Sequence, residues 1–351
     1  MKYTFEITIA GCAANCAHCY VDGGPGAIMP PADYALCLEK LVPALDRLGG
    51  DISLNLGNET FCHPRVAELF RLTDRVCPQY FDRRGEDFPT TGVALLRHRD
   101  RENILNELRR KGISELFFAL HGSADVHDRM VGFPGRYEQL FETADFLTAQ
   151  GFAVSFSLML TKALLPGLEE VLERIGHYPG AKVFPVVPLY CPTPRMRRYE
   201  QYRATAPELL AMCEHLERHG VQTDKIRRMC AECTRAAIRQ SGMDVDAEMA
   251  AATQWAFFHI DRDLRLYYGN AGMHTRFLGD LRQMTAEQVF AALASLGANY
   301  DFEAFYPREA FCRLAARLPE LSVNTLVYPS RPDCYYAWLD ELGEPNLLLS
   351  P

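Results

Sequence analysis

Residues 3–20 read YTFEITIAGCAANCAHCY. Residues 3–10 alternate in polarity and are rich in threonine, isoleucine and phenylalanine, which predicts a β-strand. Directly after them, Cys12, Cys16 and Cys19 follow the spacing C-x3-C-x2-C on a predicted loop. Thiolates this close in sequence can wrap one iron–sulfur cubane. A [4Fe–4S] cubane then keeps one iron without a protein ligand, and an open position of this kind is typical of catalytic metal sites.

A zinc site is the alternative that these residues leave open. The same cysteines could form a zinc knuckle with a distant fourth ligand, and His18 could serve as that ligand. Zinc loops, however, favour C-x2-C pairs, and this loop directly follows the first predicted strand. We therefore favour the iron–sulfur interpretation.

Strand-like and helix-like segments alternate over about the first 190 residues. The predicted strands are 3–10, 51–56, 88–91, 115–120, 152–160 and 182–189, and the predicted helices are 33–48, 64–76, 101–111, 136–150 and 165–175. Such alternation predicts a parallel sheet, and right-handed crossovers would curl these units into a partial (β/α)6 TIM-like barrel of the α/β class. Active sites of such barrels lie at the C-terminal ends of the strands, where the cysteine loop is expected.

The pattern changes after about residue 194. The later elements predicted are helices at 206–219, 285–296 and 303–317, and a hairpin, FHIDRDLRLYY, at 258–268. We expect two domains, a barrel over 1–205 and a smaller α+β domain over 206–351.

Composition and charge narrow the class of protein. The net charge of −8 argues against a nucleic-acid partner, and no apolar stretch is long enough to predict a membrane span. The start of the chain does not resemble a secretory signal, so we expect a cytoplasmic protein. Twelve cysteines in a reducing compartment favour metal ligation and catalysis over disulfides. The basic runs at 195–198 and 227–228 are interpreted as solvated faces.

The cysteine loop resembles the motif of the radical S-adenosylmethionine (SAM) superfamily, C-x3-C-x-aromatic-C, with His18 in the aromatic position. The resemblance implies that SAM chelates the open iron of a [4Fe–4S] cluster through its amino and carboxylate groups. One electron from the cluster then cleaves SAM into methionine and a 5′-deoxyadenosyl radical, which abstracts a hydrogen atom from the substrate. It also implies a flavodoxin or ferredoxin as electron donor.

Further segments support this resemblance, which covers residues 3 to about 190. Residues 56–60, LGNET, are similar to the family's Gly-Gly-Glu-Pro motif, with Asn58 and Thr60 departing from it. Residues 89–92, PTTG, are similar to Thr-Asn-Gly after strand three, and residues 119–135 resemble the strand-four segment of the branch that includes peptide maturases. The expected SAM contacts are His18, Tyr20, Gly57, Asn58, Glu59, Ser123 and Ser155.

A second cysteine group, Cys230 and Cys233, has the spacing C-x2-C. Two interpretations are open: an ordinary helical turn, or part of an auxiliary iron–sulfur cluster completed by Cys312 and Cys334. The hairpin near residue 260 resembles that of the SPASM or twitch domain of related enzymes. The cysteine expected just after the hairpin is missing, so we expect a degenerate domain of this type.

Cys191 lies at the end of the sixth predicted strand, where the active-site rim of the barrel is expected. A thiol at this place could donate a hydrogen atom to a substrate radical, as in epimerases of the superfamily. Packing in the interior is the alternative.

We therefore expect a radical SAM enzyme whose substrate is a small molecule, such as a natural product, sugar or nucleoside. The chain begins directly with its first strand, without an N-terminal peptide-binding domain, which favours a small molecule. A peptide-modifying maturase is the second hypothesis. A non-catalytic iron–sulfur or zinc protein is an alternative of another class. We expect neither a membrane nor a nucleic-acid partner.

Overall fold

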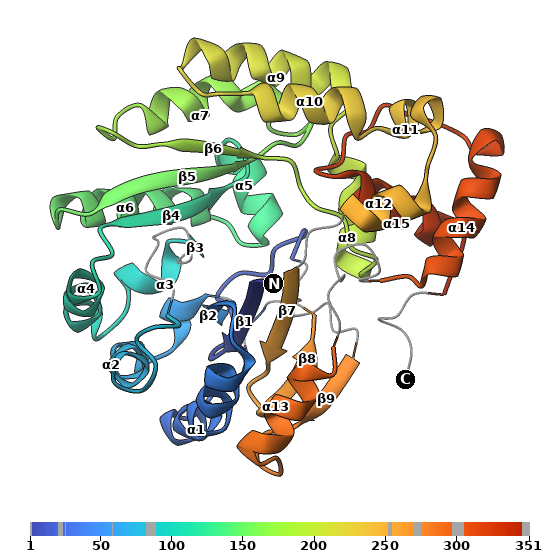
Figure 1. The fold of residues 1–351 in the computed structure, drawn as a ribbon. Helices are drawn as coiled ribbons and strands as arrows, with labels where there is room; N and C mark the ends of the chain where they lie inside the picture. Colours follow the sequence, from blue (N-terminus) through green and yellow to red (C-terminus); the bar gives the residue numbers. More distant parts are fainter. Residues whose placement is uncertain are drawn as a thin grey trace. The chain divides into compact units, whose positions relative to one another are not determined.

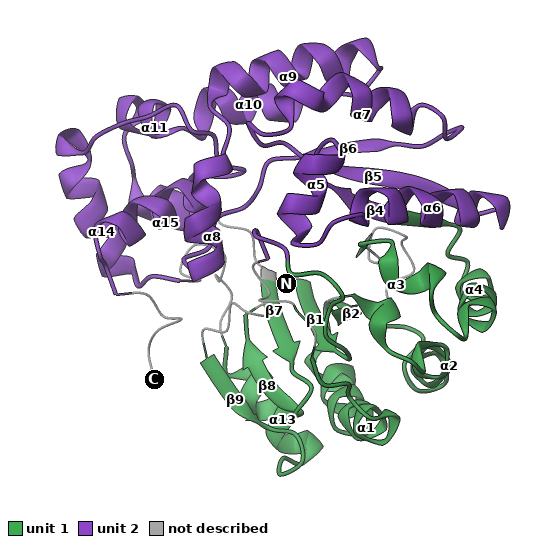
Figure 2. Ribbon diagram, turned by 180° about the vertical axis from the view of Figure 1, so that it is seen from behind, with its two compact units in different colours: residues 1–15, 20–116, 253–304 green, residues 16–19, 117–252, 305–351 purple. Residues whose placement is uncertain are grey.

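The computed structural model describes residues 2–19, 24, 26–57, 59–81, 89–251, 255–269, 276–296 and 305–345 (Figure 1). The chain divides into two compact units (Figure 2). Unit 1 comprises residues 1–15, 20–116 and 253–304, and unit 2 comprises residues 16–19, 117–252 and 305–351. Each unit is described by itself.

Unit 1 combines strands from both ends of its sequence with helices from its middle. Its strands are β1 (Lys2–Thr8), β2 (Asp51–Gly57), β3 (Pro89–Thr90), β7 (Trp255–Ile260), β8 (Arg265–Tyr268) and β9 (Arg276–Asp280). Its helices are α1 (Pro31–Leu48), the short 3-10 helix η1 (Thr60–Cys62), α2 (Val66–Val76), α3 (Val93–Leu96), α4 (Arg101–Arg110) and α13 (Ala286–Ala294).

The sheet of unit 1 has the strand order β2-β1-β7-β8-β9. β1 pairs in parallel with β2 on one side and β7 on the other, which places Thr8 opposite Gly57 and Ile7 opposite Ile260. β8 and β9 continue the sheet in antiparallel fashion. Phe5 and Phe258 are both buried and stack at 4.7 Å, because neighbouring strands place residues in register on the same face.

Unit 2 contains a short parallel sheet and most of the later helices. Its strands are β4 (Glu115–Leu120) from Phe117 onward, β5 (Ala153–Met159) and β6 (Val183–Val186). Its helices are α5 (Ala124–Val131), α6 (Arg136–Ala149), η3 (Leu165–Gly167), α7 (Leu168–Ile175), α8 (Pro194–Tyr199), η4 (Glu200–Tyr202), α9 (Ala206–Arg218), α10 (Asp224–Glu232), α11 (Arg235–Ser241), α12 (Val245–Ala251), α14 (Arg308–Arg317), η5 (Leu318–Glu320) and α15 (Arg331–Glu341).

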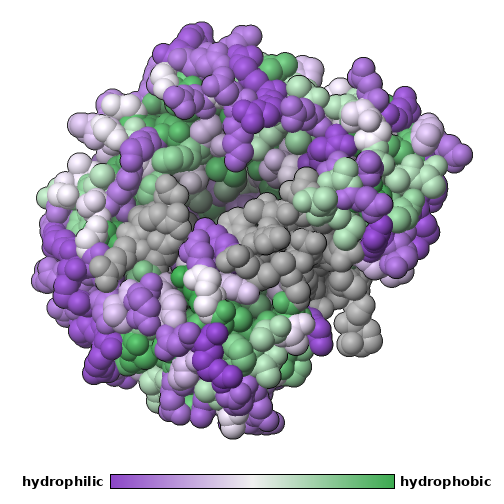
Figure 3. Space-filling model, in the orientation of Figure 1, coloured by the Kyte–Doolittle hydropathy of each residue, from purple (hydrophilic) through white to green (hydrophobic). Residues whose placement is uncertain are grey.

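The strands of unit 2 are neighbours in the order β4-β5-β6. β5 and β6 are parallel, with Phe156 opposite Val183, and the ring of Phe156 stacks on that of Phe118 at 5.8 Å. α9 packs against both α7 and α10, and Figure 3 shows a largely hydrophilic surface over α9 and α10. The parallel strands joined by helices confirm the predicted α/β class.

Several predicted elements differ in detail from the structure. β6 is shorter than the predicted strand 182–189: it includes Pro185 and ends at Val186, ahead of Pro188, which has no N–H to give to a ladder. The helix predicted from 64 begins at Val66, after a turn that contains Pro64. The C-x2-C group lies on α10 and its C-cap, and α8, α11, α12 and α15 were not predicted.

The predicted hairpin is present as β7 and β8, and β7 joins β1 in the first sheet. Unit 1 thus includes residues 253–304, so the two compact units divide the chain differently from the expected domains 1–205 and 206–351. That domain division stays a prediction. Among the described residues, no helix has both the length and the apolar character needed to cross a bilayer.

Candidate active site

The loop that carries Cys12 begins with a close approach between backbone segments of unit 1. The Cys12 N–H donates to the carbonyl of Gly24 at 2.8 Å. A Cβ on Gly11 would meet the Gly24 carbonyl oxygen and the Gly26 nitrogen, each at 2.5 Å, so only glycine fits at this position. The Ala14 N–H donates to the Cys12 sulfur at 3.3 Å, a contact that is strongest when the sulfur is a thiolate.

The remainder of the loop, residues 16–19, belongs to unit 2. The Cys19 N–H donates to the Cys16 carbonyl at 3.2 Å, and the Ala17 N–H donates to the carbonyl of Met130 at 2.8 Å. The guanidinium of Arg195 also donates to the Cys16 carbonyl, at 3.3 Å. Contacts from α5 and α8 therefore fix the backbone around these two cysteines.

The three cysteines of the loop fit an iron–sulfur cluster by their chemistry. Cys12, Cys16 and Cys19 are half-exposed, whereas most of the other cysteines, such as Cys37 and Cys77, are buried. Thiolates are the usual ligands of such clusters, and the hydrogen bond to the Cys12 sulfur is of the kind that tunes them. Within the described part of the chain, no three histidine, cysteine or acidic side chains are arranged to hold a metal ion.

Glu59 follows β2 and is 3% exposed. Its carboxylate accepts hydrogen bonds from the Thr90 hydroxyl at 2.9 Å, the Thr91 N–H at 2.7 Å and the Thr91 hydroxyl at 2.9 Å. Burial raises the pKa of Glu59, and the threonine hydrogen bonds oppose that rise. A carboxylate has about four acceptor sites, so this group, which we call the carboxylate site (Glu59, Thr90, Thr91), keeps about one for a further donor.

Gly57 ends β2 next to the carboxylate site. A Cβ at Gly57 would lie 2.4 Å from Oε1 of Glu6 on the neighbouring strand β1. The absence of a side chain at Gly57 therefore leaves room for the Glu6 side chain. The sequence motif thus has a packing reason at this position. Asn58 and Tyr20, two further predicted SAM contacts, lie outside the described residues.

A group of buried rings surrounds His18 in unit 2. The His18 ring lies 4.3 Å from the ring of His121 and 5.4 Å from the ring of Tyr199, and His121 lies 5.4 Å from His127. We call His18, His121, His127 and Tyr199 the histidine–tyrosine cluster. It joins the cysteine loop, the end of β4, α5 and α8.

The atoms of the histidine–tyrosine cluster are neutral and partly unpartnered. Burial lowers the pKa of His18 and His127 to about 4, and it lowers the pKa of His121 well below its usual value. The backbone N–H of His121 donates to His127 Nδ1 at 3.4 Å, which places the proton of neutral His127 on Nε2. Within the described residues, His18 Nδ1, His121 Nδ1 and the Tyr199 hydroxyl are buried without a hydrogen-bond partner.

The two predicted serine contacts differ from each other. Ser123, the N-cap of α5, is half-buried and makes no side-chain cap, and its Cβ lies where a Cβ on Gly167 would come within 3.0 Å. Ser155 on β5 is fully buried, and its hydroxyl accepts from the Lys182 N–H at 3.2 Å. The Ser155 hydroxyl thus already bonds the backbone of the residue before β6.

Cys191 lies in a segment of unit 2 that is held from both sides. The buried guanidinium of Arg203 donates to the carbonyls of Pro188 and Leu189, at 2.6 and 3.2 Å. The Tyr190 N–H donates to Asp333 at 2.7 Å. Cys191 itself is fully buried, and burial raises the pKa of its thiol to about 12, with a smaller influence from Cys19. At neutral pH Cys191 is therefore a protonated thiol.

The cysteines of the predicted auxiliary cluster lie on several helices of unit 2. Cys230 is in α10, Cys233 caps it, Cys312 is exposed on α14, and Cys334 is buried in α15. Burial raises the pKa of Cys230 and Cys233 to about 11, with Cys213 acting on Cys230. Burial raises the pKa of Cys334 to about 12, and Cys233 makes a smaller contribution in the same direction. The auxiliary cluster stays a prediction.

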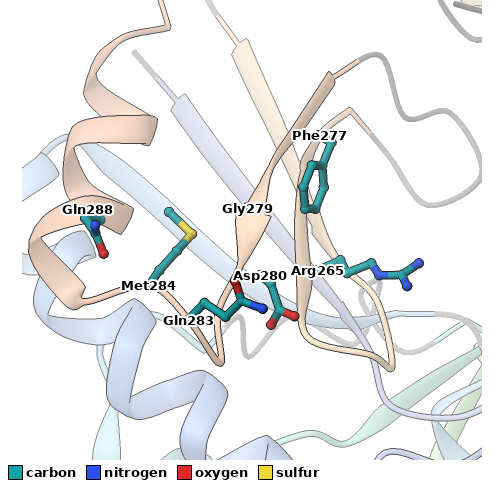
Figure 4. A pocket seen from close by; sticks show the side chains of 7 residues that line it. All are labelled: Arg265, Phe277, Gly279, Asp280, Gln283, Met284 and Gln288. Carbon is teal, nitrogen blue, oxygen red and sulfur yellow. The ribbon is translucent and has the colours of Figure 1, made fainter. Parts of the chain in front are cut away.

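A hollow of about 570 Å³ is present in unit 1, away from the predicted site residues (Figure 4). Arg265, Phe277, Met284 and Gln288 are among the residues that line it, and Figure 4 shows them around Gly279 on β9. A Cβ on Gly279 would meet the Met284 sulfur at 2.3 Å. Arg265 and Asp280 are the titratable side chains among these described lining residues.

Sequence reasoning missed Tyr199 and Arg195 as neighbours of the cysteine loop. The run at 195–198 was interpreted as a solvated face, and nothing in its spacing indicates that Tyr199 turns inward against His18. Gly11 carried a signal that could have been used, because a glycine before a metal-binding loop often marks a close backbone approach.

Comparison with known proteins finds similarity at the level of structure. No protein-family model matches the sequence, and no curated protein matches it. Native anSMEcpe with bound AdoMet matches with a TM-score of 0.53 and 14% identity, over 97% of this chain and 98% of that chain. Native anSMEcpe with bound AdoMet and Kp18Cys peptide matches with a TM-score of 0.54 and 14% identity, over 97% and 99%.

A weaker match is coproporphyrinogen III oxidase (HemN) from Escherichia coli, a radical SAM enzyme, with a TM-score of 0.43 and 14% identity over 97% of this chain and 90% of that chain. The anSMEcpe matches extend over nearly the whole chain, and they confirm the predicted fold class. The chain therefore has the α/β fold of radical SAM enzymes.

Proposed function

We propose that this protein is a radical SAM enzyme. The observation that carries the proposal is the C-x3-C-x2-C loop, which directly follows β1 in a chain with the fold of AdoMet-bound anSMEcpe. Cys12, Cys16 and Cys19 would hold a [4Fe–4S] cluster. When bound and reduced, the cluster would supply the one electron that cleaves SAM into methionine and a 5′-deoxyadenosyl radical, which takes a hydrogen atom from the substrate.

The carboxylate site would bind the amino group of SAM. Glu59 is held in one position by Thr90 and Thr91, so little conformational entropy is lost when a cation approaches. A positively charged ammonium also favours the ionised form of a carboxyl whose pKa burial has raised. Gly57 and Asn58 would complete this side of SAM.

The histidine–tyrosine cluster would supply polar contacts to SAM in unit 2. Its three unpartnered atoms can accept or donate, and a bound ligand would remove the cost of leaving them buried without a hydrogen bond. Ser123, which makes no cap at α5, is a further contact, together with Tyr20. Ser155 is a weaker candidate, because its hydroxyl already accepts from Lys182.

Cys191 would donate a hydrogen atom to the substrate radical. A donor of this kind must carry its hydrogen at neutral pH, and the raised pKa of Cys191 keeps it as a thiol. The hydrogen bonds from Arg203 and to Asp333 hold the segment in place. If a Cys191→Ala variant still releases 5′-deoxyadenosine and forms the normal product, this role is wrong.

The substrate proposed first is a small molecule, such as a natural product, sugar or nucleoside. A peptide is the second candidate, and the specific observation in its favour is the peptide bound in matched structures of anSMEcpe. Deuterium transfer separates the two. Candidates of each class, deuterated at the reacting carbon, are tested for transfer of the label into 5′-deoxyadenosine.

Two smaller proposals follow from the cysteines. An auxiliary cluster on Cys230, Cys233, Cys312 and Cys334 would retain iron in a variant that lacks the cysteines of the loop. If that variant contains no iron after anaerobic reconstitution, the auxiliary cluster is absent. Because thiolates that hold a metal cluster persist in a reducing compartment, we also propose a cytoplasmic location.

The test of the function is anaerobic reconstitution with iron and sulfide, followed by SAM and dithionite. We expect 5′-deoxyadenosine and methionine in equal amounts, and no product from a Cys16→Ala variant. A Cys37→Ala variant is the matched control, because Cys37 is buried in α1. If the reconstituted protein binds zinc, or holds a cluster and leaves SAM intact, it is a non-catalytic zinc or iron–sulfur protein.

A further inference from the structure

The sheet of unit 1 has two faces of different chemistry. One face carries Phe5 and Phe258, which are buried and stack on each other. Along β1, Phe5 alternates with Thr4 and Glu6, whose side chains therefore point to the other face. Thr4 and Thr8 on this second face are buried although they are polar. Because a polar face shielded from water costs free energy unless its groups are hydrogen-bonded, we expect a polar ligand on it.

One row of side chains crosses this polar face from strand to strand. The register of the sheet places Glu6 of β1 opposite Asn55 of β2 and opposite His259 of β7. It also places His259 opposite Tyr267 of β8, and Tyr267 opposite Phe277 of β9. Residues in register point to the same face of a sheet. We call these side chains the five-strand row (Asn55, Glu6, His259, Tyr267, Phe277).

The first end of the five-strand row consists of hydrogen-bond acceptors. Glu6 is half-buried, and its Oε1 lies where a Cβ on Gly57 would come within 2.4 Å. Asn55 Oδ1 is buried and has no hydrogen-bond partner among the described residues. His259 is 4% exposed, and its Nε2 lies 2.8 Å from Thr8 Oγ1. Two neighbouring acceptors, one of them charged, are suited to a ligand group with several N–H donors, such as an ammonium.

The other end of the row is aromatic. The rings of His259 and Tyr267 stack at 6.3 Å, and the ring of Tyr267 lies 5.4 Å from that of Phe277. Phe277 is 57% exposed, and Figure 4 shows Phe277 and Met284 on opposite sides of β9. An exposed ring beside a half-buried one offers a surface on which a planar ligand ring can stack.

The spacing and the charge of the row narrow the ligand further. Neighbouring strands lie about 4.8 Å apart, so roughly 10 Å separate Glu6 from Tyr267. A planar ring joined to an amine by a short chain fits this span. A hydrogen bond with the Tyr267 hydroxyl, and then the charge of Asp261, raise the pKa of Arg265. That cation of β8 is thus already paired, and the charge offered by the row is the negative charge of Glu6.

We propose that the five-strand row is the substrate site, and that it takes a small molecule with a planar ring and a basic amino group. The ammonium would bind Glu6 and Asn55, and the ring would stack on Tyr267 and Phe277. This inference rests on the proposed function and names a substrate class for it. Glu6 lies beside Gly57, a proposed SAM contact, so the ligand would lie close to SAM.

The test uses two probes that share a ring and differ in charge. Tryptamine carries an ammonium on an indole ring, and indole-3-acetate carries a carboxylate on the same ring. Each probe is titrated anaerobically by calorimetry into the reconstituted full chain, with and without SAM. The variants are Glu6→Gln, Phe277→Ala and a control, Glu102→Gln, which changes an exposed glutamate of α4. Phe277 is exposed, so Phe277→Ala tests the row even if Glu6→Gln folds poorly.

We expect tryptamine to bind about tenfold more tightly than indole-3-acetate, because the carboxylate of Glu6 attracts one probe and repels the other. Glu6→Gln should weaken tryptamine binding about tenfold and should not weaken indole-3-acetate binding. Phe277→Ala should weaken both about threefold, because both probes stack. Glu102→Gln should change either affinity by less than about twofold.

Several results would overturn the proposal: no binding of tryptamine, equal affinity for the two probes, or equal losses in Glu6→Gln and Glu102→Gln. Competition between SAM and tryptamine would assign the row to SAM and would overturn it as well. Failure of the reduced protein to release 5′-deoxyadenosine would instead reject the proposed function, and the probe titrations would still report on the row.

Discussion

The carboxylate site in unit 1 and the histidine–tyrosine cluster in unit 2 differ in whether their buried polar atoms have hydrogen-bond partners. In unit 1, both oxygens of Glu59 accept hydrogen bonds from Thr90 and Thr91. In unit 2, His18 Nδ1, His121 Nδ1 and the Tyr199 hydroxyl are buried without partners within the described residues. Buried polar groups are nearly always hydrogen-bonded. The Glu59 carboxylate meets that need without a ligand and keeps about one acceptor position for a further donor, whereas the three atoms of unit 2 would gain a hydrogen bond only from a ligand.

The largest expected effect on stability comes from a substitution in the carboxylate site. Glu59→Ala leaves two hydroxyls and one N–H without their acceptor, and we expect the free energy of unfolding to fall by roughly 4 kcal/mol. Chemical denaturation measures this loss. Glu39→Ala, at the surface of the same unit, should change it by less than about 0.5 kcal/mol. If Glu59→Ala is as stable as the unsubstituted protein, the threonine hydrogen bonds do not stabilise unit 1.

The contributions of Glu59 and His127 to stability should change with pH in opposite directions. The pKa of Glu59 is raised, so its contribution to stability is present at low pH and is lost as the pH rises through its folded pKa. Burial lowers the pKa of His127 from 6.5 to about 4, so its contribution is present above pH 6.5 and is lost as the pH falls towards 4.

His127→Gln tests the second half of this statement. We expect the substitution to remove roughly 3 kcal/mol of the decrease in unfolding free energy between pH 6.5 and pH 4. Denaturation curves at several pH values measure it. His177→Gln, which replaces an exposed histidine, is the control and should leave the slope unchanged. An identical slope in His127→Gln would mean that this histidine does not stay neutral in the folded protein.

A substitution at Gly11 tests the backbone contact before Cys12. Gly11→Ala places a methyl group against the backbone of Gly24 and Gly26, and we expect the free energy of unfolding to fall by about 2 kcal/mol together with poorer retention of iron after reconstitution. Gly24→Ala is the matched control, since a Cβ at Gly24 meets nothing within 4 Å. Equal iron content in the two variants would contradict the importance of this contact.

The smallest expected effect on stability comes from removing single tyrosine hydroxyls, one with a hydrogen-bond partner and one without. Tyr199→Phe removes a buried hydroxyl without a partner, so the ligand-free protein should gain about 1 kcal/mol, while its affinity for SAM falls about tenfold. Tyr34→Phe removes a hydroxyl that bonds Thr73 at 2.6 Å and should lose about 1 kcal/mol. Denaturation and SAM titration measure both. A stability loss in Tyr199→Phe would show that its hydroxyl has a partner in solution.

The parts of the molecule that the sequence could predict are those with a local cause. β1, β4 and the β7–β8 hairpin follow from alternation and turn residues. Glu59 and the PTTG segment were each singled out as motifs, but the hydrogen bonds that join them were not predicted. The parallel pairing of β1 with β7 was not predicted, because the contact joins residues about 250 positions apart and leaves no local signal.

Only part of the histidine–tyrosine cluster could be singled out from the sequence, for the same reason. His18 and His121 lie in motifs, but Tyr199 lies in a basic helix whose polarity indicates exposure. Its ring is buried because α8 turns one face towards the cysteine loop, and that orientation depends on Arg197 and Asp340, which are 143 residues apart. Spacing alone does not reveal such contacts.

The central claim is that the cysteine loop leaves one iron of a cubane open to SAM. Electron paramagnetic resonance of the anaerobically reconstituted, dithionite-reduced protein tests it most directly, with spectra recorded before and after SAM is added. We predict the signal of a reduced [4Fe–4S] cluster whose g-values shift when SAM binds. A reduced cluster whose spectrum is the same with and without SAM would contradict the account.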